Sequence, residues 1–253
     1  MPDTADHRQF VKPFVYETLD SRALHFSICE IQSRMRLQNP DALDLAYTRT
    51  MMAFLLFVPR PEQLAMIGLG GGSLAKFCHR HLGDTRIEVV EINPHVIALR
   101  DQFQVPPDDV RLQIRRGDGA DFVRQGRDRL DVLLVDGFDH EGQPPALCSQ
   151  AFYDDCREIL RGDGILVVNL HTAHPEFARH AARIERAFDG DVLLVGDDEC
   201  SNTIAFAGRG VGRGGPRPGV LRRPGTLDGR AWGELMPAFA RVVGALQRHR
   251  AGE

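Results

Sequence analysis

Seven short apolar runs, separated by segments with helical spacing, fill the middle of the chain. They span residues 64–69, 87–92, 111–115, 130–136, 164–170, 192–195 and 203–207. Nearly continuous apolar runs of this length are typical of strands buried on both faces, and the intervening helices allow such strands to lie parallel. The pattern therefore predicts an α/β protein with a Rossmann-like, doubly wound, mostly parallel sheet.

The two ends of the chain differ from this middle part. Residues 14–18 and 24–32 are β-type pieces on either side of a polar turn, so residues 1–40 are predicted to form a small β-hairpin element. Residues 40–57 have helical spacing, with Asp41 placed to cap the start, and residues 41–208 are assigned to the Rossmann-like domain. Residues 209–253 comprise a loop rich in Gly, Arg and Pro and an amphipathic helix that is expected to dock on the body.

Composition and charge exclude several classes of protein. The longest apolar run has eight residues, at 51–58, whereas a helix needs about 20 to span a bilayer, so no membrane partner is expected. The formal net charge of -4 gives no general attraction for nucleic acid, and the glycine- and arginine-rich stretch is interpreted as a solvated loop. Five scattered cysteines without a CxxC pair, behind a polar N-terminus, predict a cytoplasmic protein without a metal site.

A glycine-rich turn follows the first of the seven runs directly. It reads Gly68-Leu69-Gly70-Gly71-Gly72-Ser73 and leads into a helical segment. Glycines at positions such as Gly68, Gly70 and Gly72 let the backbone approach a ligand closely, and the helix that follows offers N–H groups without partners. The strict GxGxxG pattern fails at Ser73, so a turn that only packs a strand against a helix stays an alternative.

Acidic residues follow the next three strands. Glu91 ends the second strand and is placed to accept the ribose hydroxyls of a nucleoside, while Asp118, beside Gly119, is placed to accept from an adenine amino group. Asp136 ends the fourth strand and Asp139 follows it. Each could instead be a helix cap or a turn residue, but the carboxyl ends of parallel strands share one crevice, so together they predict a nucleoside site.

The kind of nucleoside follows from what accompanies these acids. No tyrosine is followed four residues later by the lysine of a short-chain dehydrogenase, and Lys76 is not part of a P-loop. An acidic crevice with few lysines favours a cationic ligand over phosphates. The sequence therefore predicts S-adenosylmethionine or a related sulfonium nucleoside, bound to a fold of the class I methyltransferase type.

The same motifs resemble those of the spermidine synthases, the polyamine aminopropyltransferases. That family has a Glu-Ile-Asp-Pro where this chain has Glu91-Ile92-Asn93-Pro94, and a Gly-Asp-Gly/Ala where it has Gly117-Asp118-Gly119. The most specific likeness is DVLLVDGFDHEGQPPALCSQAFY at 131–153, which aligns without a gap to the family's longest motif. Tyr47 falls where the family keeps an active-site tyrosine, and Gln32 resembles a glutamine of its N-terminal hairpin; the likeness covers about residues 14–207.

The resemblance implies a reaction and a role for each residue. An amine acceptor attacks the methylene carbon next to the sulfonium of decarboxylated S-adenosylmethionine and releases methylthioadenosine. Asp136 would take the amine proton with Tyr47 as its partner, Asp139 would hold the far ammonium group, and Gln32 would contact the substrate. The resemblance also implies a homodimer that uses a small amine and no metal.

Several positions depart from the family pattern. The family's aspartate in the glycine turn, which binds the amine of the aminopropyl group, falls on Gly71, and a His or Gln and a Glu fall on Thr48 and Arg49. The proline after the second aspartate of the long motif is His140. These changes remove negative charge from the amine end of the site, so two alternatives stay open: a methyltransferase that uses intact S-adenosylmethionine, and a catalytically silent nucleoside-binding homologue.

Overall fold

The predicted central sheet is present with all seven strands. The computed structural model describes residues 10–27, 31–138, 142–197, 201–209, 211 and 221–251. Within these ranges the sheet order is β6-β5-β4-β7-β8-β10-β9, with parallel pairing from β6 through β8 and antiparallel pairing of β10 to both neighbours. The strands are β4 (Gln63–Ile67), β5 (Arg86–Glu91), β6 (Leu112–Arg116), β7 (Leu130–Val135), β8 (Leu160–His171), β9 (Val192–Gly196) and β10 (Asn202–Ala207).

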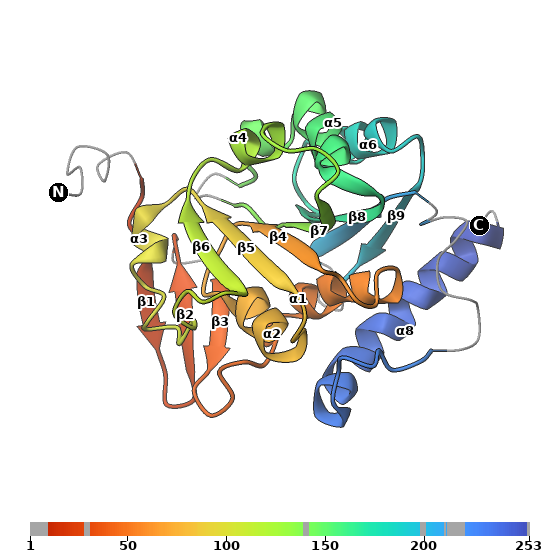
Figure 1. Ribbon diagram of the computed structural model, residues 1–253. Coiled ribbons are helices and arrows are strands. Elements are labelled where there is room, and N and C mark those ends of the chain that lie inside the picture. The colour runs from red at the N-terminus through yellow and green to blue at the C-terminus, as the bar shows by residue number, and fades with distance from the viewer. Residues whose placement is uncertain are drawn as a thin grey trace.

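Helices cover both faces of this sheet (Figure 1). Alternate strand residues point to opposite sides, so Leu134 packs with one core while its neighbours Leu133 and Val135 pack with the other. The doubly wound arrangement is therefore confirmed. One face carries α1 (Ala46–Met51), α2 (Ser73–His81) and α8 (Gly229–Ala251), and the other carries α4 (Gly119–Arg124), α5 (Gln150–Ile159) and α6 (Phe177–Ala187). Two shorter helices are α3 (Pro94–Ile97) and η3 (Pro145–Leu147).

The N-terminal element contains one strand more than the predicted hairpin. Strands β1 (Phe14–Glu17), β2 (Ser21–His25) and β3 (Ile31–Arg36) form an antiparallel sheet. Residues 24–32 read as one β-type piece in the sequence, but β2 ends at His25 and β3 begins at Ile31. Leu24 and Met35 of this sheet pack on Phe103 and Val105, which joins the element to the loop before β6.

The predicted helix at 40–57 is wrong at its start. Helix α1 begins only after Leu45, with no side-chain cap, and continues as the 3₁₀ helix η2 (Met52–Leu56). Asp41 instead pairs with Arg80 of α2. The sequence shows a helical period that starts near a residue able to cap a helix, but Asp41 forms its ion pair with the distant Arg80 instead.

The amphipathic C-terminal segment forms α8 and docks on the body as expected. Its buried residues, among them Leu235, Phe239 and Val242, belong to the same core as Met51 and Phe54. No described helix combines the length and the apolar character needed to cross a membrane. The division of the chain at residues 40 and 208 stays a prediction.

Candidate active site

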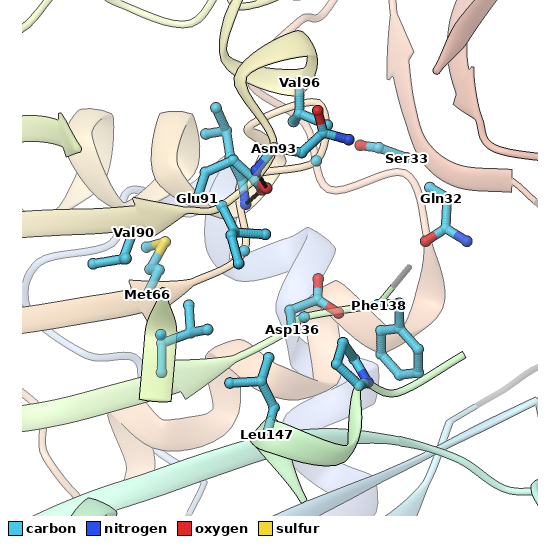
Figure 2. Close-up of a pocket in the computed structure, with 18 of the residues that line it drawn as sticks. Gln32, Ser33, Met66, Val90, Glu91, Asn93, Val96, Asp136, Phe138 and Leu147 are labelled. Carbon is cyan, nitrogen blue, oxygen red and sulfur yellow. Dashed lines mark hydrogen bonds between the residues drawn. The ribbon is translucent and has the colours of Figure 1, made fainter. Parts of the chain in front are cut away.

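A cavity of about 340 Å³ opens at the carboxyl ends of the central strands. Its size is that of a pocket for a small molecule. Residues at or after the ends of β4, β5, β6 and β7 line it together with residues of β3 and α1. Figure 2 shows Gln32 and Ser33 of β3 across the cavity from Glu91. Among the residues singled out in the sequence, those that line this cavity are Gln32, Tyr47, Gly68, Gly70, Glu91, Asp118, Gly119 and Asp136.

Two of the predicted residues are not part of this described wall. Gly72 caps the N-terminus of α2 and faces the side chain of Val105, where it has a φ of 69°. Its conformation serves the turn rather than the cavity surface. Asp139 and the neighbouring His140 lie outside the described residues, so their roles stay predictions.

Gly68 is the position where the turn depends most strictly on glycine. Its φ is 96°, and a Cβ there would overlap the backbone carbonyl oxygen of Asp136. This close approach brings the end of β4 against the end of β7. The glycine therefore sets the position of Asp136 as well as the path of the turn.

Glu91 lines the cavity from the end of β5 and also supports the glycine turn. Its Oε2 accepts from the backbone N–H of Leu69 at 2.9 Å, and its Oε1 accepts from that of Asn93 at 2.8 Å. Only 8% of the residue is exposed. Burial raises the pKa of this carboxyl, and the backbone N–H groups oppose the rise. A carboxylate can accept about four hydrogen bonds, so acceptor capacity is left for a ligand.

Asp118 combines the two roles that the sequence left open. Its Oδ1 accepts from the backbone N–H of Ala120 at 2.7 Å and caps α4, while the residue also lines the cavity. Gly119 follows it and packs against Ile67, where a side chain would collide. A helix cap and a cavity-lining acid are therefore the same residue here, and Oδ2 is left for a ligand.

Two side chains from other parts of the chain donate hydrogen bonds to the Asp136 carboxylate. Its Oδ2 accepts from the Tyr47 hydroxyl at 3.0 Å, and its Oδ1 accepts from Asn169 Nδ2 at 2.9 Å. Burial raises the pKa of Asp136, and the two hydrogen bonds oppose that rise. Burial and the charge of Asp136 raise the pKa of Tyr47 well above its usual value, so Tyr47 stays a neutral donor. The pair joins α1 to the end of β7 by the contact that the family resemblance implied, and the catalytic role of the two residues stays a prediction.

Asn169 is a functional candidate that the sequence analysis missed. It lies inside an apolar run of β8, and no motif marks it. Its alignment with the end of β7 arises from the pairing of Val135 with Val168 in the parallel ladder. A polar residue within a buried strand, next to the strand that carries the acid, is the signal that could have found it.

The space where the family has an acid in the glycine turn is filled in this chain. A Cβ on Gly71 would lie 2.7 Å from Ser33 Oγ and 2.8 Å from a ring carbon of Phe103. Ser33 comes from β3, and its hydroxyl lies 3.4 Å from that of Ser73 at the start of α2. Both serines line the cavity. Neutral hydroxyls therefore stand near the position of the family's carboxylate.

Asn93 explains the departure from Glu-Ile-Asp-Pro. Its Oδ1 accepts from the backbone N–H of His95, as an aspartate could, but its Nδ2 also donates to the backbone carbonyl of Val11 at 2.9 Å. Phe10 and Val11 line the cavity. Only the amide can make this second bond, so Asn93 ties the N-terminal segment to the cavity wall beside Glu91.

We expect Asn93→Asp to weaken the binding of methylthioadenosine about 5- to 10-fold, because it removes this tie and sets a carboxylate against a carbonyl oxygen. Calorimetric titration measures the change. The substitution keeps the cap of α3, so the thermal stability of the protein is expected to change little. An unchanged affinity would show that residues 10 and 11 do not close the site.

Among the described residues, no three His, Cys, Asp or Glu side chains gather as ligands for a metal ion. The polar groups of the cavity are instead hydroxyls, carboxylates, the side-chain amides of Gln32 and Asn93, and backbone groups. These groups suit an uncharged sugar and base together with a cationic group.

Comparisons with known proteins give the site its context. The family model for the spermine/spermidine synthase domain matches residues 44–186. A polyamine aminopropyltransferase of Neisseria meningitidis (strain Z2491) is 39% identical over 188 residues, which is 74% of this chain and 72% of that protein.

Two solved structures share the fold. A probable spermidine synthase from Corynebacterium glutamicum superposes with a TM-score of 0.67 at 19% identity, over 78% of this chain and 76% of that one. Human methyltransferase-like protein 13, in a complex with SAH, gives a TM-score of 0.60 at 22% identity, over 82% and 93%. These likenesses confirm the class I methyltransferase type of fold, and the family match and the relative from Neisseria show that the chain belongs to the spermine/spermidine synthase family.

Proposed function

We propose that the protein transfers the aminopropyl group of decarboxylated S-adenosylmethionine to a di- or polyamine and releases methylthioadenosine. The single observation that carries this proposal is the pairing of Tyr47 with Asp136 in the cavity that Glu91 and Asp118 also line. Relatives named as polyamine aminopropyltransferases support the same reaction.

The nucleoside half of the site rests on Glu91 and Asp118. Each keeps acceptor capacity after its contacts with the protein: Glu91 toward the ribose hydroxyls and Asp118 toward the adenine amino group. Met66, Val90 and Leu147 supply apolar surface to the same cavity (Figure 2). This arrangement supports a nucleoside with its sulfur end directed toward Asp136.

The amine half rests on Asp136, Tyr47 and Gln32, with Asp139 as the proposed holder of the far ammonium group. An alkyl ammonium has a pKa near 10, so freeing the amine at neutral pH costs about 4 to 5 kcal/mol. Asp136 accepts the proton, the nitrogen lone pair attacks the methylene carbon, and the electrons of the broken C–S bond pass to sulfur. The raised pKa of Asp136 makes it a better base than an exposed aspartate.

Methyl transfer from intact S-adenosylmethionine is the second candidate. One observation favours it: the donor end near Gly71 presents Ser33 and Ser73 in place of an acid, so a substrate carboxylate meets less repulsion there. Against it, Glu91, Asp118 and Asp136 still make the cavity acidic. We therefore keep the decarboxylated nucleoside as the proposed donor.

Calorimetric titration with the two donors tests this choice. We expect decarboxylated S-adenosylmethionine to bind at least tenfold more tightly than the intact form, because the acidic cavity repels the extra carboxylate. Methylthioadenosine serves as the control, since it lacks the group that differs. A preference for the intact form would favour the methyltransferase instead.

We also propose that the protein works as a homodimer in the cytoplasm. Phe14 and Ile31 both pair across His25, so they lie on one face of the N-terminal sheet, and both are exposed together with Tyr16. An apolar face of this kind suits a second copy of the chain. Light scattering measures the oligomeric state, and a monomer at micromolar concentration would contradict the proposed dimer.

The described cysteines Cys78, Cys148 and Cys156 are free, which suits the reducing compartment that the proposal of a cytoplasmic protein requires.

A further inference from the structure

The two oxygens of the Asp136 carboxylate have different surroundings. Oδ2 receives the Tyr47 hydroxyl at the cavity wall, and Oδ1 receives the amide of Asn169 from β8. Asn169 is only 2% exposed, and it is not among the residues that line the cavity. Asn169 therefore acts on a ligand only through Asp136.

An asparagine amide can present either its NH₂ group or its oxygen to a neighbour, so something must set its orientation. Here Asn202 of β10 donates its Nδ2 to Asn169 Oδ1 at 2.8 Å. Asn202 Oδ1 in turn accepts from Ser201 Oγ at 2.9 Å. With its oxygen taken by Asn202, Asn169 has its NH₂ group directed at Asp136.

We propose that Asn169, oriented by Asn202, is a positioning residue that fixes Asp136 Oδ1 and leaves Oδ2 as the oxygen that takes the amine proton. This inference rests on the proposed function of Asp136 as proton acceptor. Successive hydrogen bonds that point the same way polarise one another, so the row stabilises the ionised carboxylate where burial disfavours it.

The surroundings of Asp136 are simple enough for this effect to be measured. Of the described residues, Tyr47 on α1 is the titratable group hydrogen-bonded to Asp136, while β8 contributes the neutral Asn169 and β4 is followed by Gly68. Glu91 and Asp118 line the same cavity from the ends of β5 and β6. No described lysine or arginine lines that cavity.

Asn202→Asp is the decisive variant, because it puts an acceptor where the donor stood. If Asn169 keeps its orientation, its oxygen faces an oxygen of the introduced carboxylate, which is unfavourable. If Asn169 turns its NH₂ group toward that carboxylate, Asp136 loses its hydrogen-bond donor. We expect the acid limb of the kcat profile to rise by about one pH unit, and the rate below that limb to fall about tenfold. The KM for the donor is expected to stay the same, since no ligand contact changes.

Two further variants separate this role from a merely structural one. Asn202→Ala removes the donor without adding an acceptor, so Asn169 still prefers the carboxylate and the profile is expected to shift little. Asn169→Leu removes the bond to Asp136 and is expected to shift the limb on its own. When Asn169→Leu and Asn202→Asp are combined, the acid limb is expected to lie where Asn169→Leu alone puts it. A further rise would show that the new charge acts on Asp136 through space rather than through Asn169.

A readout without turnover keeps this inference separate from the proposed function. The carboxyl carbon resonance of Asp136, identified by its absence in Asp136→Asn, reports the titration of this group in each variant. We expect it to titrate higher in Asn202→Asp than in wild type and Asn202→Ala. The same titration midpoint of Asp136 in wild type, Asn202→Asp and Asn202→Ala would overturn the positioning role. If the midpoint rises in Asn202→Asp as expected but the wild-type protein forms no aminopropylated product, only the proposed reaction is overturned.

Discussion

Replacing Asp136 with asparagine is expected to lower kcat for aminopropyl transfer by about 10²- to 10⁴-fold, the range for loss of a general base. The substitution keeps the size of the side chain: the asparagine oxygen can accept from the Asn169 amide, and its NH₂ group can donate to the Tyr47 hydroxyl oxygen. It removes the charge that takes up the amine proton. A coupled assay of methylthioadenosine release measures the change.

The affinity for methylthioadenosine separates loss of the base from loss of the site. We expect it to stay nearly constant in Asp136→Asn, because Glu91 and Asp118 bind the nucleoside. Asp121→Asn on α4 is the matched control, since Asp121 is exposed and pairs with Arg124 outside the cavity. Full activity of Asp136→Asn would remove this residue from the role of base.

The second large effect is expected from Gly68→Ala, which should destabilise the protein by about 3 kcal/mol or more. A left-handed backbone at a residue with a side chain costs about 1 kcal/mol or more. The added methyl group must also displace the backbone carbonyl of Asp136, which cannot rotate away. Chemical denaturation measures the free energy of unfolding.

Gly83→Ala is the control for this experiment. Gly83 lies between α2 and β5 with open space where its Cβ would stand, so its substitution is expected to change stability by less than about 1 kcal/mol. If the Gly68 variant were as stable as the Gly83 variant, the close approach of β4 and β7 would not depend on glycine.

The strands of the central sheet could be predicted because a strand that is buried on both faces consists of nearly continuous apolar residues. The sequence pattern does not separate β2 from β3, since residues 24–32 keep a β-type character across the break between them. It also assigned Asp41 to a helix cap, although the residue is satisfied by Arg80 on another helix. The local pattern of apolar residues predicts which segments are buried. The partner of a polar side chain that lies far away in the chain depends on tertiary packing.

The candidate site divides in the same way. Glu91, Asp118 and Asp136 could be predicted because they follow strands whose ends must meet at one edge of the sheet. Ser33, Asn93 and Asn169 could not, since each acts through a residue far away in the chain: Gly71, Val11 and Asp136. The tie from Asn93 to Val11 shows that one such departure from the family pattern has a structural purpose.

The most direct test of the account is to identify the products formed from decarboxylated S-adenosylmethionine and a panel of diamines and polyamines by mass spectrometry. We predict methylthioadenosine and, in equal amount, an amine heavier by one aminopropyl group. Intact S-adenosylmethionine should yield neither a methylated amine nor S-adenosylhomocysteine. Methylated product from the intact donor, or methylthioadenosine binding without any product across the whole panel, would contradict the account.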